Sequence, residues 1–123
     1  MALATVMCLS LIFAAMCAAA KDEAPLVCNL KAISAEDRPI YKGLKQRLQA
    51  AVIRQSEVPD GYTYLLDSKK ASLPEVAQWI TMERLCCPFL TFRLDVERNG
   101  DTSLTLRGPE GVKAILREEF PQR

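Results

Sequence analysis

Two adjacent cysteines, Cys86 and Cys87, are the residues of this chain with the clearest chemical potential. They stand directly before Pro88, at the end of a segment with helical periodicity. A thiolate can act as a nucleophile, as a redox centre or as a ligand for a thiophilic metal ion. Because the chain contains no histidine, no imidazole base can activate either thiol. The pair therefore identifies a candidate site and leaves several chemistries open.

Glu83 should share a helical face with this pair, because residues three and four apart are neighbours on a helix. Its carboxylate could accept a thiol proton or supply an oxygen ligand to a metal ion. The same negative charge and the C-terminal end of a helix both oppose thiolate formation. A highly activated cysteine instead lies at a helix N-terminus or beside a cation, and the C-x-x-C spacing of many oxidoreductases is absent. An enzymatic role is therefore less expected than a binding role.

Cys28 offers a third sulfur for the same site. With the adjacent pair it would form a two- or three-sulfur site for zinc, copper(I), mercury(II) or trivalent arsenic. A complete structural zinc site needs four ligands, and Glu83 is the candidate for the fourth. We therefore predict soft-metal or metalloid binding, or thiol-based sensing, through a metal site whose ligands are Cys28, Cys86, Cys87 and Glu83.

The alternative interpretation is a non-catalytic interaction domain or small-ligand-binding domain with structural cysteines. Unpaired cysteines are often buried as small apolar side chains, and this pair could fill a helix-to-strand corner. In that case Glu83 is a surface carboxylate or a member of a helix-side ion pair. The surroundings of the two sulfur atoms decide between the interpretations.

Residues 1–20 carry no charged side chain and end in three alanines, which is the small-residue pattern of a signal-peptide cleavage site. We therefore expect a signal peptide cleaved before Lys21 and a periplasmic or secreted protein. The alternative is an N-terminal membrane anchor, because about 20 apolar residues can span a bilayer. Lipid attachment at Cys17 is a third possibility. Either alternative would tether the protein to a membrane.

After such a cleavage the chain would retain Cys28, Cys86 and Cys87. An odd number of cysteines in an oxidising compartment implies one disulfide with a spare thiol, a bridge between chains, or thiols held by a metal ion. A bridge from Cys28 to either member of the pair would close a loop of about 58 residues and stabilise the fold by roughly 4 kcal/mol. A disulfide between the adjacent cysteines is also conceivable, although its geometry would be strained.

Length and charge limit the other function classes. The chain has 123 residues, with 16 basic and 15 acidic side chains and a net charge of +1. This length suits one small domain. The charges are interspersed, and no block of lysine and arginine could neutralise several phosphates together, so no nucleic-acid partner is expected. Neither composition nor motif identifies a protein partner.

The helix expected over about 37–50 follows Ser34 and Asp37, which resemble the start of a capping box. Its apolar residues recur at helical spacing, and they are Ile40, Leu44, Leu48, Ala51 and Val52. This helix does not carry the cysteines, so its importance to the site depends on how it packs.

The second expected helix begins at the capping box of Ser72 and Glu75 and ends before Pro88, because proline disfavours helical geometry at the preceding residue. A third helix opens after Gly108 and closes at Pro121. Its buried stripe is expected to comprise Val112, Ile115, Leu116 and Phe120.

Two hairpins lie between these helices. Pro-Asp-Gly at 59–61 separates two extended runs, and a turn at 98–101 separates the alternating segments 90–97 and 103–107. One helix followed by two strand-strand-helix units predicts an α+β fold, with a four-stranded antiparallel sheet and the helices on one face. The expected organisation is a signal peptide or anchor at 1–20, an entry segment at 21–36 and a single domain at 37–123.

Several of these segments resemble a family of small, uncharacterised bacterial proteins with the recurrent core E-R-x-C-C-P-F-x-x-F, which is residues 83–92 here. The resemblance covers essentially residues 28–120 and implies no established activity. It implies a set of shared positions, which are Cys28, Glu83, Arg84, Cys86, Cys87 and Pro88. Members of the family resemble cytoplasmic proteins, so the exported N-terminus is the unusual feature of this chain.

Overall fold

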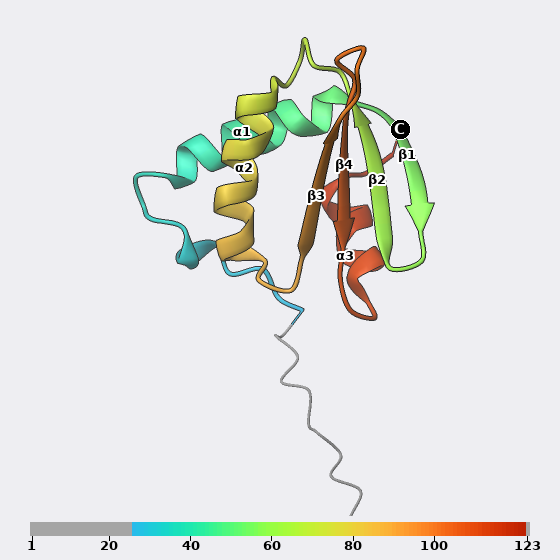
Figure 1. Cartoon of the computed structure of the whole chain (residues 1–123). Helices are drawn as coiled ribbons and strands as arrows, with labels where there is room; N and C mark the ends of the chain where they lie inside the picture. The colour runs from blue at the N-terminus through green and yellow to red at the C-terminus, as the bar shows by residue number, and fades with distance from the viewer. Residues whose placement is uncertain (1–25, 123) are drawn as a thin grey trace, which may run out of the picture.

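The computed structural model describes residues 26–122 of the chain (Figure 1). The elements in order are η1 (Leu30–Ala32), α1 (Arg38–Ala51), β1 (Val52–Val58), β2 (Gly61–Leu66), α2 (Leu73–Cys86), β3 (Thr91–Val96), β4 (Thr102–Arg107) and α3 (Val112–Glu119). One helix followed by two strand-strand-helix units confirms the predicted α+β fold. The signal peptide, cleavage site, anchor and lipid attachment predicted for residues 1–21 lie outside the described residues.

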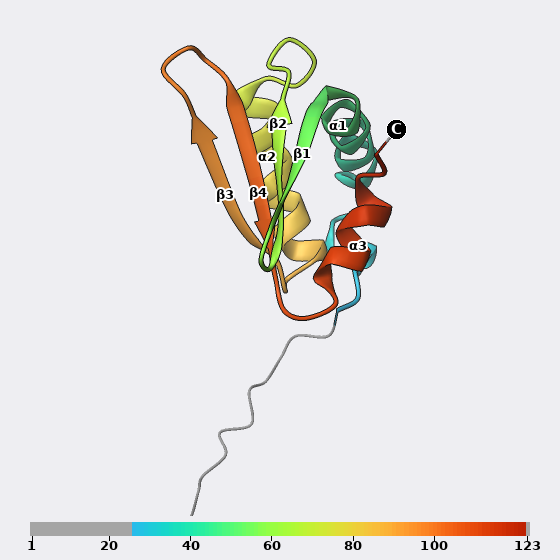
Figure 2. The same ribbon diagram turned by 90° about the vertical axis from the view of Figure 1, so that its right-hand side faces the viewer.

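The four strands form one antiparallel sheet in the order β1-β2-β4-β3. Strand β1 pairs with β2 in the first hairpin, and β3 pairs with β4 in the second. The two hairpins are joined by pairing of β2 with β4, for example through Tyr64 opposite Leu104. The helices lie on one side of this sheet, as the two views show (Figure 1, Figure 2). Among residues 26–122, no helix combines the length and the apolar character that crossing a membrane requires.

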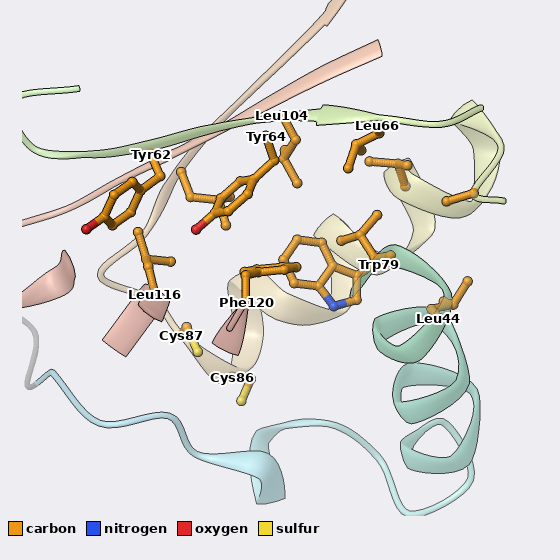
Figure 3. Packing of buried hydrophobic residues seen from close by; sticks show 14 of the residues in the cluster. Leu44, Tyr62, Tyr64, Leu66, Trp79, Cys86, Cys87, Leu104, Leu116 and Phe120 are labelled. Atoms are coloured by element: carbon orange, nitrogen blue, oxygen red, sulfur yellow. The ribbon is translucent and has the colours of Figure 1, made fainter. Parts of the chain in front are cut away.

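The core lies between the sheet and the helices (Figure 3). Alternate residues of β2 and β4 point toward the helices because successive side chains of a strand face opposite sides. Aromatic rings link the layers, since the centroid of Phe120 lies 4.7 Å from that of Tyr64 and 6.0 Å from that of Trp79. Trp79 of α2 is fully buried.

Helix α1 differs from the prediction at its start. Asp37 is the N-cap residue, but its side chain makes no capping hydrogen bond, and the Ser34 hydroxyl accepts the Asp37 N–H at 3.2 Å in the preceding turn. The expected buried residue Ile40 is 46% exposed, whereas Tyr41 is 4% exposed. Tyr41 continues the three-and-four spacing of the buried residues Leu44, Leu48 and Ala51. The buried stripe is therefore rotated, and it brings a phenol hydroxyl toward α2.

Helix α2 begins as predicted. The Ser72 hydroxyl accepts the Glu75 N–H at 3.4 Å, and the Glu75 carboxylate accepts the Ser72 N–H at 2.9 Å. These reciprocal bonds satisfy two of the amide groups that a helix start leaves without partners. The helix that carries the adjacent cysteines is thus well defined at the end opposite to them.

Candidate thiol and carboxylate site

The adjacent cysteines occupy the C-terminal corner of α2. Cys86 is the last helical residue, and Cys87 is the C-cap residue, whose N–H donates to the Glu83 carbonyl at 2.7 Å. Pro88 follows and ends the helix as predicted, because its ring disfavours helical geometry at Cys87. Cys86 and Cys87 are 3% and 1% exposed, so both contribute to the core as the structural interpretation expected.

The N-terminal segment returns to this corner and is held there by backbone contacts. The Asn29 N–H donates to the Cys86 carbonyl at 2.8 Å, which satisfies one of the carbonyls that a helix end leaves without a partner. Ile33 is buried in the core. The Arg38 side chain donates to the carbonyls of Leu30 and Ile33 at 3.3 and 3.1 Å. The segment carrying Cys28 is therefore attached to the corner by polar and apolar contacts.

Cys28 and Cys87 form a disulfide, with their Cα atoms 4.7 Å apart. The hydrogen bond from Asn29 to Cys86 explains the choice of partner, because the residue before Asn29 then lies beside the residue after Cys86. Cys86 is the one free cysteine among residues 26–122, and it is buried. The sequence left several arrangements of the three cysteines open. The structure shows one of them, a single disulfide with one spare thiol.

The sulfur atoms of Cys28, Cys86 and Cys87 all lie within 4.8 Å of one another. Figure 3 shows the side chains of Cys86 and Cys87 directed away from the sheet, toward the N-terminal segment. Three sulfurs from two segments far apart in the sequence therefore converge. This is the arrangement that the sulfur-based site predicted from the sequence requires.

Glu83 lies one helical turn before the pair and is 1% exposed. The alternative expectation of a surface carboxylate is therefore wrong. The Tyr41 hydroxyl donates to Glu83 Oε2 at 2.6 Å. Burial raises the pKa of Glu83 to about 7, the Tyr41 hydrogen bond lowers it, and the charges of Glu119 and Lys45 raise and lower it respectively. The carboxyl group is thus poised to change its charge near neutral pH.

Glu119, at the end of α3, is a member of the site that the sequence analysis missed. Carboxylate oxygens of Glu83 and Glu119 and the sulfur of Cys28 all lie within 4.8 Å of one another. Lys45 Nζ lies 2.5 Å from Glu119 Oε2 and forms an ion pair with it. The only hint in the sequence was the position of Glu119 next to the apolar Phe120, which did not indicate which helix it would meet.

The surroundings of Cys86 oppose its ionisation. Burial raises the pKa of the Cys86 thiol, and the negative charges of Glu83 and Glu119 raise it further, while Lys45 and the Tyr41 hydroxyl act in the opposite direction. A thiol of this kind is a poor nucleophile at neutral pH, because the thiolate is the reactive form. The sequence predicted this opposition to ionisation from the charge of Glu83 and from the helix end.

The four residues predicted as metal ligands thus meet at one corner of the molecule, although not as a single set. The three sulfurs form one group, and Glu83 joins the other group, with Cys28 and Glu119. Arg84, which belongs to the motif, is exposed, as expected for a residue about 100° around the helix from Glu83. Cys28 is the shared member and is partly exposed, whereas Cys86 and Cys87 are buried.

The chain was compared with family models, with curated proteins and with solved structures. None of these comparisons finds a match. The chemistry of the site therefore has to be inferred from its own residues, their distances and their charges.

Proposed function

We propose that this protein binds thiophilic metal or metalloid ions through Cys28, Cys86 and Cys87 when the Cys28–Cys87 disulfide is reduced. The observation that supports this proposal is the convergence of the three sulfur atoms within 4.8 Å. Thiolate sulfur is the preferred ligand of soft ions, which include copper(I), mercury(II) and trivalent arsenic, and it also binds zinc. The three sulfurs need only a small rearrangement to reach one ion.

The disulfide makes this binding dependent on redox state. With Cys28 and Cys87 bonded to each other, Cys86 provides the one free thiol among residues 26–122. A dithiol reductant opens the bond by exchange, in which the reductant becomes the disulfide and both cysteine sulfurs are released as thiols. Ion binding and the disulfide therefore exclude each other, and the same site would sense thiol redox state. The presence of the disulfide also supports the proposed export to an oxidising compartment.

Native mass spectrometry of the full chain tests this function. The protein is reduced, freed of reductant under anaerobic conditions and exposed separately to zinc(II), copper(I), mercury(II) and arsenite. We expect one ion per reduced chain and loss of that ion in the oxidised protein. A variant with Cys8→Ser and Cys17→Ser must keep the ion, because these cysteines lie outside the proposed site. If the reduced chain retains none of the four ions, the proposal is wrong.

The second candidate function is a non-catalytic interaction or small-ligand-binding domain in which the cysteines are structural. The burial of Cys86 and Cys87 in the core cluster favours it. In that case Cys86→Ala lowers the free energy of unfolding and no thiophilic ion is retained. The mass spectrum of the reduced protein therefore separates the two functions directly.

A further inference from the structure

We propose that the three-sulfur site takes up a trivalent metalloid, arsenic or antimony, as its uncharged hydroxide and in preference to zinc. This inference rests on the proposed function and names the substrate class of the same site. It is supported by the number of soft ligands, by the charge that the complex would carry and by the polar groups that surround it.

The number of sulfurs suits a trivalent metalloid. Arsenic(III) bonded to three sulfurs is complete, because a lone pair occupies its remaining position. Zinc in a protein is almost always bound by four ligands in a tetrahedron. The chain has no histidine, and residues 26–122 contain no fourth cysteine. The fourth ligand of a zinc ion would be a water molecule or a carboxylate oxygen of Glu83 or Glu119, and both carboxylates group with Cys28 and not with all three sulfurs.

The charge of the complex favours the metalloid more strongly. Three thiolates around zinc(II) leave one negative charge, and a carboxylate ligand adds another. Three thiolates around arsenic(III) leave none. Cys86, Cys87 and Glu83 are all buried, and a net charge in buried surroundings is strongly destabilising unless it is paired. Lys45 is the cation at this site, and it is already paired with Glu119.

Uptake of the hydroxide is a condensation. Each of the three thiols gives its proton to one hydroxyl group, three arsenic–oxygen bonds are replaced by three arsenic–sulfur bonds, and three water molecules leave. No electron is transferred and no proton is released to solvent. Zinc binding, in contrast, requires thiols to release protons. The carboxylates of Glu83 and Glu119 lie near the sulfurs, and their negative charge repels the negatively charged zinc complex. The arsenic complex carries no net charge, so the carboxylates do not repel it.

This inference assigns Glu83 a place beside the metalloid and not in its ligand set. Its Oε2 atom already accepts the Tyr41 hydroxyl hydrogen bond. Glu83→Gln keeps the side-chain shape and an oxygen that can accept the same hydrogen bond. We therefore expect this variant to bind arsenite with unchanged stoichiometry, whereas any zinc binding that uses the carboxylate is lost.

The test uses the reduced full chain carrying Cys8→Ser and Cys17→Ser, titrated at neutral pH with arsenite and with zinc(II). Native mass spectrometry should show a gain of one arsenic atom and a loss of three hydrogens. Competition should show arsenite bound at least about tenfold more tightly than zinc, a difference of about 1.4 kcal/mol. Cys86→Ser is the decisive variant, because it retains the disulfide pair and can be shown to fold before reduction. It should weaken arsenite binding by at least about tenfold.

The outcomes separate this inference from the proposed function. Zinc bound as tightly as arsenite, or bound while arsenite is not, overturns the metalloid preference and leaves thiophilic ion binding intact. A mass gain that corresponds to loss of only two hydrogens, or full arsenite affinity in Cys86→Ser, overturns the three-sulfur geometry. Absence of every ion overturns both proposals.

Discussion

The Tyr41 hydroxyl lies 2.6 Å from Glu83 Oε2, and this hydrogen bond connects α1 to the helix that carries the adjacent cysteines. Both residues are buried. The bond compensates part of the cost of placing a carboxyl group in the core, because a buried polar group without a partner is strongly destabilising. The candidate site thus depends on how α1 and α2 pack and not only on the cysteine motif.

The first prediction concerns the pH dependence of stability. The Glu83 pKa rises from its ordinary 4.5 to about 7 in the folded protein, so Glu83 contributes stability that is fully present below pH 4.5 and is lost as the pH rises to 7. The expected loss is about 3 kcal/mol. Urea unfolding of the wild type and of Glu83→Gln across this range measures it as the difference between the two proteins. If the free energies of unfolding of the two proteins changed with pH in the same way, the prediction would be wrong.

The groups that face Glu83 determine the size of this effect. They come from three helices and are Tyr41, Lys45, Cys86 and Glu119. Glu119→Gln should lower the Glu83 pKa, because it removes a negative charge, and it should also remove the ion pair with Lys45. The free energy of unfolding of Glu119→Gln should therefore be compared with that of the Glu83→Gln/Glu119→Gln double variant across the same pH range. The steepest part of this difference should lie at lower pH than the steepest part of the difference between the wild type and Glu83→Gln. An unchanged midpoint would exclude a contribution from Glu119.

The second prediction concerns the hydrogen bond itself. Tyr41→Phe removes the hydroxyl and leaves Glu83 buried without this donor, so we expect a loss of about 1–3 kcal/mol above neutral pH, where Glu83 is charged. The loss should be smaller in mild acid, because a protonated carboxyl group needs the donor less. A double-mutant cycle with Glu83→Gln isolates the coupling between the two side chains. Equal losses at both pH values would show that the contribution of the hydroxyl does not depend on the charge of Glu83.

The third prediction concerns the Cys28–Cys87 disulfide. The bonded residues are 59 positions apart, and opening a loop of this length should cost roughly 4 kcal/mol of unfolding free energy. Cys28→Ser should show this loss in urea unfolding without reductant, and added reductant should change it little further. Cys86→Ser is the matched control, because it leaves the disulfide in place.

Thiol counting checks the same pairing. In the unreduced Cys8→Ser/Cys17→Ser background, the denatured chain should react with one equivalent of thiol reagent, from Cys86. Three reactive thiols would refute the disulfide. No reactive thiol would indicate that Cys86 forms a bridge to a second chain.

The fourth prediction concerns the start of α2. Ser72→Ala removes a hydroxyl that accepts the Glu75 N–H, and it should cost about 1 kcal/mol, which thermal unfolding can detect. Ser34→Ala is the matched control, since its hydroxyl accepts only the exposed Asp37 N–H in the turn before α1. We expect the control to cost less than about 0.5 kcal/mol. A larger effect at Ser34 would show that the turn before α1 matters more than the capping box.

Local pattern alone predicted most of the secondary structure. The spacing of apolar residues, the Ser72–Glu75 capping box and Pro88 defined α2 to within one residue of its observed C-terminal end. Turn residues between alternating segments predicted both hairpins. These features depend on backbone preferences over a few residues, so they can be read from the chain directly. The adjacent cysteines could be placed at the end of a helix for the same reason.

The tertiary structure decided how these pieces meet. The hairpin patterns did not specify that β2 and β4 would pair, and the helical period alone did not distinguish Tyr41 from Ile40 as the residue facing inward. The choice of Cys87 as the partner of Cys28 follows from the Asn29–Cys86 hydrogen bond, which joins distant segments.

The composition of the site has the same origin. The amino-acid sequence determined that a vicinal thiol pair with a carboxylate one turn earlier would stand at a helix end, because helical spacing is a local property. Only packing brought Cys28, Glu119 and Tyr41 to that corner and buried Glu83 there. Burial and charge in the site depend on which surfaces of α1, α2 and α3 exclude water together, and that is a property of the whole fold.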